Sequence, residues 1–121
     1  MKKIDNPVTT YWNNRGETYS KSWQSVAKKR FSQMETGLVK NVLSSLSRKF
    51  KKKPIKTLDI GIAIGRITDE IIDYNVIHYA TDISQTMIQF SEEKYKANKK
   101  VKQLKIHDIH NPLPKDRFPY E

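Results

Sequence analysis

Apolar residues along this chain follow two different periods, and the change occurs at Pro54. Before Pro54, apolar residues recur at spacings of three and four, which is the period of a helix with one apolar face. This pattern predicts a helix over residues 26–50, which Pro54 ends because proline cannot continue a helix. The stripe on this helix consists of Phe31, Met34, Leu38, Val42 and Leu46, with Leu43 and Phe50 nearby.

Short elements of alternating type follow Pro54. The pattern predicts strands over residues 55–60, 76–82 and 101–107 and helices over residues 66–75 and 84–98. Ser84 has the side chain of a helix N-cap. Strands that alternate with helices indicate parallel strands joined by right-handed crossovers. We therefore expect an α/β protein built on half of a doubly wound sheet.

The two ends of the chain lack these periods. Residues 1–22 are polar but contain Tyr11, Trp12 and Tyr19, and Trp23 follows directly. This composition predicts a partly ordered arm rather than a linker. Residues 108–121 contain three prolines and predict a loop.

The net charge of +10 is typical of nucleic-acid-binding proteins, but it is unevenly distributed. Residues 1–57 carry 14 Lys and Arg against 3 Asp and Glu, whereas residues 58–121 carry 9 against 10. Of the 23 basic residues, 18 are Lys and 5 are Arg, and Arg is the better reader of bases and phosphates. A run of basic residues at 48–53 fits the last turn of a helix, where cations are favoured.

The chain contains no cysteine, which excludes a disulfide scaffold and any Cys-based zinc or redox site. This absence is compatible with a reducing compartment, and we expect a cytoplasmic protein. No apolar run approaches the roughly 18 residues that a membrane-spanning helix requires.

Small and acidic residues follow each of the three predicted strands. In doubly wound sheets, ligands bind outside the carboxyl ends of the strands. The candidate site therefore consists of residues 61–65, 82–83 and 108–109.

The loop after the first strand distinguishes between ligand classes. A dinucleotide fingerprint laid from Gly61 fails because Arg66 stands where a small residue is required. A P-loop is also excluded, since no Gly-Lys-Ser/Thr sequence is present. The pattern that fits is an acid followed by small residues spaced by one, namely Asp59, Gly61, Ala63 and Gly65. A plain tight turn with a capping Asp is the alternative.

This loop resembles the first motif of class I S-adenosylmethionine-dependent methyltransferases of the small-molecule type. The resemblance implies S-adenosylmethionine as cofactor, with Asp59 helping to hold its cationic methionine end. Ala63 departs from the middle glycine of the family motif, and we expect its methyl group to be tolerated or to weaken cofactor binding without abolishing it. Ile62 and Ile64 are also bulkier than the residues usual in this loop.

Two further motifs extend the resemblance. Asp82 lies 21 residues after Gly61 at the end of the second strand, where an acid can accept both ribose hydroxyls. Ile83 and Met87 would then flank the adenine. By the same resemblance, Asp108 would contact the adenine amino group and the backbone of Ile109 would contribute. The alternatives are a helix-start role for Asp82 and a core position for Met87.

The resemblance covers residues 10–118 but only the front half of the family's domain. It implies a three-layer Rossmann-like parallel sheet of strand order 3-2-1 that is incomplete, with the strand over residues 55–60 at an apolar edge. We expect an arm or lid over residues 1–25 and the N-terminal half of a methyltransferase domain over residues 26–121. The domain is expected to stop before its fourth strand and to act with a second chain that completes the sheet.

Within this resemblance Tyr11, Arg15 and Tyr19 are candidates for a lid over the cofactor or substrate. Packing of the arm's aromatic residues on the helices of the sheet is the alternative. No residue is identified as catalytic.

Two other functions remain open. The first is a half-domain that binds S-adenosylmethionine or adenosine without catalysis, or an inactive remnant of an enzyme. The second is a basic nucleic-acid-binding protein, whose affinity would fall steeply with salt. We expect no metal site, because His107 and His110 straddle a strand end and a loop and no third clustered ligand accompanies them.

For the methyltransferase that the resemblance implies, a small molecule is the expected methyl acceptor.

Overall fold

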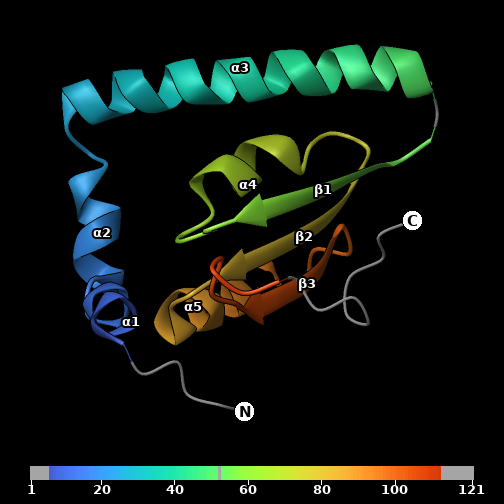
Figure 1. The fold of residues 1–121 in the computed structure, drawn as a ribbon. Coiled ribbons are helices and arrows are strands. Elements are labelled where there is room, and N and C mark those ends of the chain that lie inside the picture. Colours follow the sequence, from blue (N-terminus) through green and yellow to red (C-terminus); the bar gives the residue numbers. More distant parts are fainter. Residues whose placement is uncertain (1–5, 52, 113–121) are drawn as a thin grey trace.

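A parallel three-stranded sheet with helices packed against one of its faces forms the centre of the molecule (Figure 1). The computed structural model describes residues 6–51 and 53–112. The elements are α1 (Pro7–Asn13), α2 (Gly16–Ser22), α3 (Val26–Phe50), β1 (Ile55–Ile60), α4 (Arg66–Ile71), β2 (Val76–Asp82), α5 (Gln85–Tyr95) and β3 (Val101–Ile106). The α/β fold predicted from the sequence is confirmed.

The strands lie in the order β1-β2-β3, and both pairs are parallel. The β1–β2 register runs from Ile55 opposite Val76 to Ile60 opposite Thr81. The β2–β3 register is irregular between His78 and Tyr79. Because all strands run in one direction, their carboxyl ends meet at the same edge of the sheet, beside α1 and α2 (Figure 1).

Two separate hydrophobic clusters hold the layers together. Helices α3 and α4 lie on one side of the sheet, where Leu43 and Ile71 pack with Val76 of β2. Helix α5 packs through Ile88 and Tyr95 against Ala80, with Val101, Leu104 and Ile106 of β3 alongside. Helices α3 and α4 therefore hold β1 and the start of β2, and α5 holds the end of β2 and β3.

The arm is helical over most of its described length. Asn6 caps α1 by accepting a hydrogen bond from the Thr9 N–H at 2.8 Å, and Pro7 occupies the first helical position. Polar composition alone had predicted only partial order here, since these short helices show no apolar period. Of the predicted C-terminal loop, residues 108–112 contain no helix or strand, and residues 113–121 lie outside the described residues.

Helices α4 and α5 are shorter than predicted. Helix α4 ends at Ile71 because the chain turns back toward β2, with Tyr74 N–H donating to the Ile71 carbonyl. Helix α5 ends at Tyr95, and the Asn98 side chain then accepts from the Lys100 N–H to form the turn into β3.

Helix α3 was predicted at its observed bounds, but its apolar stripe is mostly exposed. The side chains of Phe31, Met34, Leu38 and Val42 are between 51% and 63% exposed, whereas Leu43 is 4% exposed. An apolar stripe on a helix usually faces a core. In the described part of the chain, α3 therefore turns a narrow edge of its apolar face to the sheet and leaves the rest uncovered.

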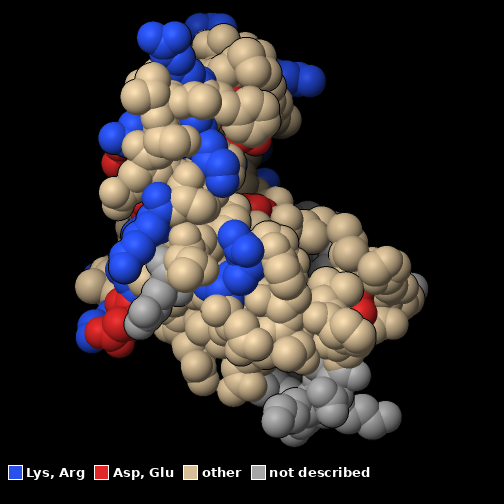
Figure 2. All heavy atoms as spheres, turned by 90° about the vertical axis from the view of Figure 1, so that its left-hand side faces the viewer, with Lys and Arg blue, Asp and Glu red and all other residues tan. Residues whose placement is uncertain are grey.

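Basic residues of the first half of the chain lie on the outside of the fold. Lys28, Lys29 and Arg30 are exposed in the first turns of α3. Figure 2 shows Lys and Arg mainly in the upper part and along one edge of the face at which the strands end. None of the described helices is both long enough and apolar enough to cross a membrane.

A buried histidine links β1, β2 and α4. His78 is fully buried, with Nδ1 2.7 Å from the Thr57 hydroxyl and Nε2 2.9 Å from the Thr68 hydroxyl. Thr68 also donates to the Asp59 carboxylate at 3.3 Å. Burial lowers the pKa of His78 from 6.5 to about 4, because the charged ring is disfavoured away from water.

His78 should make the stability of the fold depend on pH. Between pH 6.5 and about 4 the unfolded chain protonates this ring and the folded chain does not. The contribution of His78 is thus fully present above pH 6.5 and is lost as the pH falls toward 4. At about 1.4 kcal/mol per pKa unit, the loss approaches about 3 kcal/mol. Chemical denaturation at a series of pH values measures it.

The comparison variant is His78→Gln, which cannot titrate. Burial raises the pKa of Asp59, so Asp59 acts in the opposite direction, but it does so in both proteins. The variant should be less stable at pH 7 and should lose less stability on acidification. Parallel pH profiles for the two proteins would exclude this role of His78.

Candidate functional site

The loop between β1 and α4 closes onto the end of β2. Gly61 N–H and Ile62 N–H both donate to the Thr81 carbonyl, at 2.8 and 3.0 Å. Gly61 and Gly65 have positive φ values of 85° and 81°, a region that glycine enters without strain. Ala63 also lies in this region, with φ of 50°. The small residues of the predicted motif are therefore needed for the backbone path of the loop.

Asp82 connects this loop to the start of α5. Its Oδ2 accepts from the Ala63 N–H and its Oδ1 accepts from the Ser84 N–H, both at 2.9 Å. The side chain is 8% exposed at the carboxyl end of β2. Each carboxylate oxygen can accept a second hydrogen bond, so these contacts leave capacity for a ligand. Ser84, as predicted, is the N-cap of α5 and accepts from the Met87 N–H.

Helix α5 supports the same loop from its other side. Ser91 donates to the Ala63 carbonyl at 3.0 Å, and Lys94 donates to the Ile64 carbonyl at 2.9 Å. The Tyr95 hydroxyl lies 3.0 Å from the Gly65 carbonyl oxygen and 2.6 Å from Asp69 Oδ1. Burial, and then the hydrogen bond with Asp69, raise the pKa of Tyr95, so the hydroxyl stays protonated as a donor.

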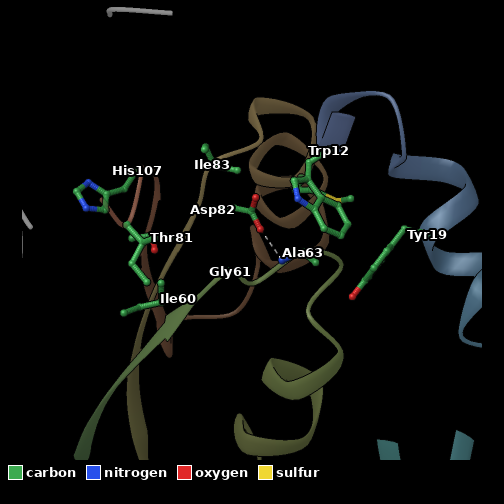
Figure 3. Close-up of a pocket in the computed structure, with 11 residues that line it drawn as sticks. Trp12, Tyr19, Ile60, Gly61, Ala63, Thr81, Asp82, Ile83 and His107 are labelled. Carbon is green, nitrogen blue, oxygen red and sulfur yellow. Dashed lines mark hydrogen bonds between the residues drawn. The ribbon is translucent and has the colours of Figure 1, made fainter. Parts of the chain in front are cut away.

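A pocket of about 340 Å³ opens where the loop, the end of β2 and the arm meet. Figure 3 shows the Asp82 side chain pointing toward Ala63, with Trp12 and Tyr19 on the side of the arm. The lining residues are Trp12, Tyr19, Ile60, Gly61, Ala63, Thr81, Asp82, Ile83, Met87, His107 and Ile109. Most of this surface is apolar, as is usual for small-molecule sites.

The structure brings some of the candidate residues together and separates others. Five of them line the pocket, namely Gly61, Ala63, Asp82, Ile83 and Ile109. Gly65 is the N-cap of α4 and does not line the pocket.

The remaining two candidates, Asp59 and Asp108, are engaged elsewhere. The Asp59 carboxyl accepts from Thr68 outside the pocket lining, and burial raises its pKa. Asp108 accepts from the backbone N–H of His110 at 3.0 Å, and its Oδ1 lies 2.8 Å from His110 Nδ1. These hydrogen bonds, the backbone one first, lower the pKa of Asp108. No group of three or more His, Asp or Glu among the described residues is placed to hold a metal ion.

Thr81 is a polar group of the pocket that the sequence analysis did not single out. Its hydroxyl is buried and has no hydrogen-bond partner among the described residues. A buried hydroxyl without a partner is costly, and a bound ligand would satisfy it. The available signal was its position directly before Asp82 at the end of a strand.

The arm reaches the pocket through Trp12 and Tyr19. Their rings pack edge to face with centroids 5.6 Å apart. Of the lid candidates, Tyr19 lines the pocket, whereas Tyr11 is 52% exposed and lies beneath the Arg15 guanidinium. The sequence analysis did not name Trp12 as a lid candidate, because the pattern of so short a helix does not show which aromatic ring faces inward.

Asn13 fastens the arm to α5. Its Oδ1 accepts from the Ser84 hydroxyl at 2.6 Å and from the Thr86 N–H at 3.3 Å. The first turn of a helix has N–H groups without intrahelical partners, and Asn13 satisfies one of them. This contact holds α1, and with it Trp12, beside the pocket.

Gly65 should be the least replaceable glycine of the chain. A Cβ added there would overlap the Tyr95 hydroxyl, and φ is positive. We expect Gly65→Ala to lower the free energy of unfolding by about 2 kcal/mol or more. Gly37 in α3 has open space around it, so Gly37→Ala should stabilise by about 0.5–1 kcal/mol. Denaturant titration measures both; equal effects would contradict the close approach of Tyr95.

The Asn13 contact can be tested at single amides. We expect Asn13→Ala to accelerate hydrogen exchange of the Thr86 amide by about tenfold, since that N–H loses its acceptor. The Met87 amide is the internal control because it donates to Ser84 and not to Asn13. Asn13→Asp keeps the acceptor oxygens and should preserve protection. Unchanged exchange at Thr86 in the alanine variant would refute the contact.

Comparison with known proteins supports the fold. The chain matches no protein-family model and no curated protein sequence. Among solved structures it is similar to the crystal structure of DszA carbon methyltransferase, with a TM-score of 0.60 and 14% sequence identity. The match covers 74% of this chain but 25% of that chain. At this identity the likeness establishes a shared fold, and this chain spans about a quarter of the length of that methyltransferase.

Proposed function

We propose that this chain is the cofactor-binding part of an S-adenosylmethionine-dependent methyltransferase that acts on a small-molecule acceptor. The observation that carries the proposal is the joining of Asp82 to the Gly61–Gly65 loop at the carboxyl ends of parallel strands. Ligands of such sheets bind at this edge. The shared fold with a carbon methyltransferase agrees with the proposal.

The residues of the pocket fit S-adenosylmethionine. Asp82 has remaining acceptor capacity for ribose hydroxyls, and the Thr81 hydroxyl has no partner among the residues that the structure describes. A Cβ at Gly61 would meet nothing within 4 Å, so the backbone is open to close approach by a ligand. Ile83, Met87 and Ile109 give the apolar surface that an adenine ring requires.

Each group then has a definite task. Asp82 would hold the ribose, while Ile83 and Ile109 would exclude water from the adenine. When bound, S-adenosylmethionine supplies a methyl group on a positively charged sulfur. Trp12 and Tyr19 of the arm would limit water at the pocket mouth and orient the acceptor. Methyl transfer depends mainly on such positioning, and we assign no residue as a general base.

A binding half-domain without catalysis is the second candidate. The observation that favours it is the engagement of polar groups by the protein itself. Asp82 accepts from two backbone amides, and His107 Nε2 lies 3.0 Å from the Asn111 carbonyl oxygen. Transfer of labelled methyl groups from S-adenosylmethionine to candidate acceptors distinguishes an enzyme from a binding module.

Calorimetric titration with S-adenosylmethionine and S-adenosylhomocysteine tests the site. We expect binding by the native chain and loss of at least about tenfold in affinity for Asp82→Ala, which removes the ribose acceptor. Asp73→Ala is the matched control, because Asp73 is an exposed acid in the turn after α4. A nucleic-acid binder would show no such response and would instead bind DNA or RNA with steep salt dependence.

Asp82 also supports the loop, so a second variant separates ligand contact from folding. Ile109 is 66% exposed and lines the pocket, so Ile109→Glu should leave the fold intact. It places a charge where the adenine is expected and should weaken binding by about tenfold or more. The proposal fails if the folded native chain binds neither ligand, or if Ile109→Glu binds both as tightly as the native chain.

A further inference from the structure

An apolar groove of about 500 Å³ lies between α3 and β1, at the edge of the sheet opposite β3. Leu38, Val42 and Leu46 contribute the α3 wall, and residues of β1 and α4 complete it. Leu38 and Val42 are 63% and 59% exposed, so the groove is open to solvent. An exposed apolar surface of this kind marks an interaction site.

The second wall of the groove is the free edge of β1. Ile55 N–H and Gly61 N–H donate toward β2, to the carbonyls of Asn75 and Thr81. Backbone groups alternate along a strand, so those of Leu58 and Ile60 point away from β2. No described strand pairs with that side of β1. The edge therefore offers a row of backbone donors and acceptors directly below an apolar helix face.

Positive charge gathers at one end of this groove. Arg48 and Lys49 in the last turn of α3, and Lys51 and Lys53 between α3 and β1, are all exposed. None of them takes part in an ion pair with another described residue. The charge at this end of the groove is thus complementary to an acidic partner and opposes a second copy of this chain, whose net charge is +10.

We propose that the groove binds an acidic, strand-forming segment of another polypeptide, which pairs with the free edge of β1. Its backbone would bond to Leu58 and Ile60, and its apolar side chains would pack under Leu38 and Val42 of α3. Its acidic residues would lie beside Arg48, Lys49, Lys51 and Lys53. Strand addition to an exposed edge is a general mode of peptide recognition. Helix α3 adds selectivity because it covers one face of the added strand.

Synthetic peptides test this interaction with the full 121-residue chain. The probe has a run of glutamates beside alternating valine and threonine, long enough to pair with Ile55–Ile60, and is made in both orders of the two blocks. The matched control peptide carries lysines in place of the glutamates. We expect at least one glutamate peptide to bind, and binding to weaken as salt is raised. The lysine peptide should bind at least about tenfold more weakly.

Hydrogen exchange identifies the bound edge. The bound peptide should protect the amides of Leu58 and Ile60, which point into the groove. The amides of Thr57 and Asp59 point toward β2 and should change little. Protection at other surfaces without protection of Leu58 and Ile60 would overturn the proposal.

Two variants test the two walls of the groove. Leu58→Pro removes an outward N–H, which an edge strand tolerates, and should weaken peptide binding about tenfold. Val42→Ser replaces an exposed helix residue and should weaken binding severalfold, even if the proline variant is unstable. Val26→Ser is the control, because Val26 is 69% exposed and does not line the groove. Binding that neither Leu58→Pro nor Val42→Ser weakens would disprove the proposal.

The remaining outcomes separate this surface from the cofactor pocket. Asp82→Ala should bind the peptide normally, so failure of cofactor binding does not affect this test. Sedimentation of the native chain alone should show a monomer. A dimer with protected Leu58 and Ile60 amides would assign the groove to a second copy instead. A folded chain that binds neither glutamate peptide would also contradict the proposal.

Discussion

The Asp82 carboxylate is the contact on which the geometry of the pocket depends. One oxygen accepts from the loop after β1 and the other from the first residues after β2. Hydrogen bonds to a charged acceptor contribute about 1.5–3 kcal/mol each, and this one carboxylate makes two of them. They also hold Ala63 in a backbone conformation that alanine rarely adopts. Without this acid, two adjacent βα connections would lose the side chain that joins them at the edge where we propose that the cofactor binds.

The second support of the loop comes from α5, and its position follows from the same strand end. Ser84 begins α5 immediately after Asp82, so the helix passes behind the loop and presents Ser91 and Tyr95 to its carbonyls. Asn13 extends this arrangement to the arm by accepting from the first turn of α5. The loop, the helix and the arm are therefore coupled through a few polar contacts. Small changes at any of them would alter the shape of the pocket.

Sequence patterns predicted the order and type of the central elements because burial imposes a period on them. The strands and α3 were found at nearly their observed bounds. The helical arm was missed, since a cap at Asn6 and not an apolar period starts α1. The strand-end rule grouped Gly61, Asp82 and Ile109 correctly at one pocket. It did not foresee that Thr68 and His110 engage Asp59 and Asp108, because hydrogen bonds of single side chains leave no periodic signal.

Periodicity also could not show that the stripe on α3 is exposed. A helical pattern states that one face is apolar, but not which part of a molecule covers it. Of the apolar residues of α3 in the described part of the chain, Leu43 is the one that is deeply buried. Leu38 and Val42 are exposed and lie beside the free edge of β1. The basic residues beside that edge oppose pairing between copies of the chain, as lysines on edge strands commonly do. The same positive charge would attract an acidic strand. The basic residues would therefore both disfavour pairing between copies of this chain and favour an acidic partner.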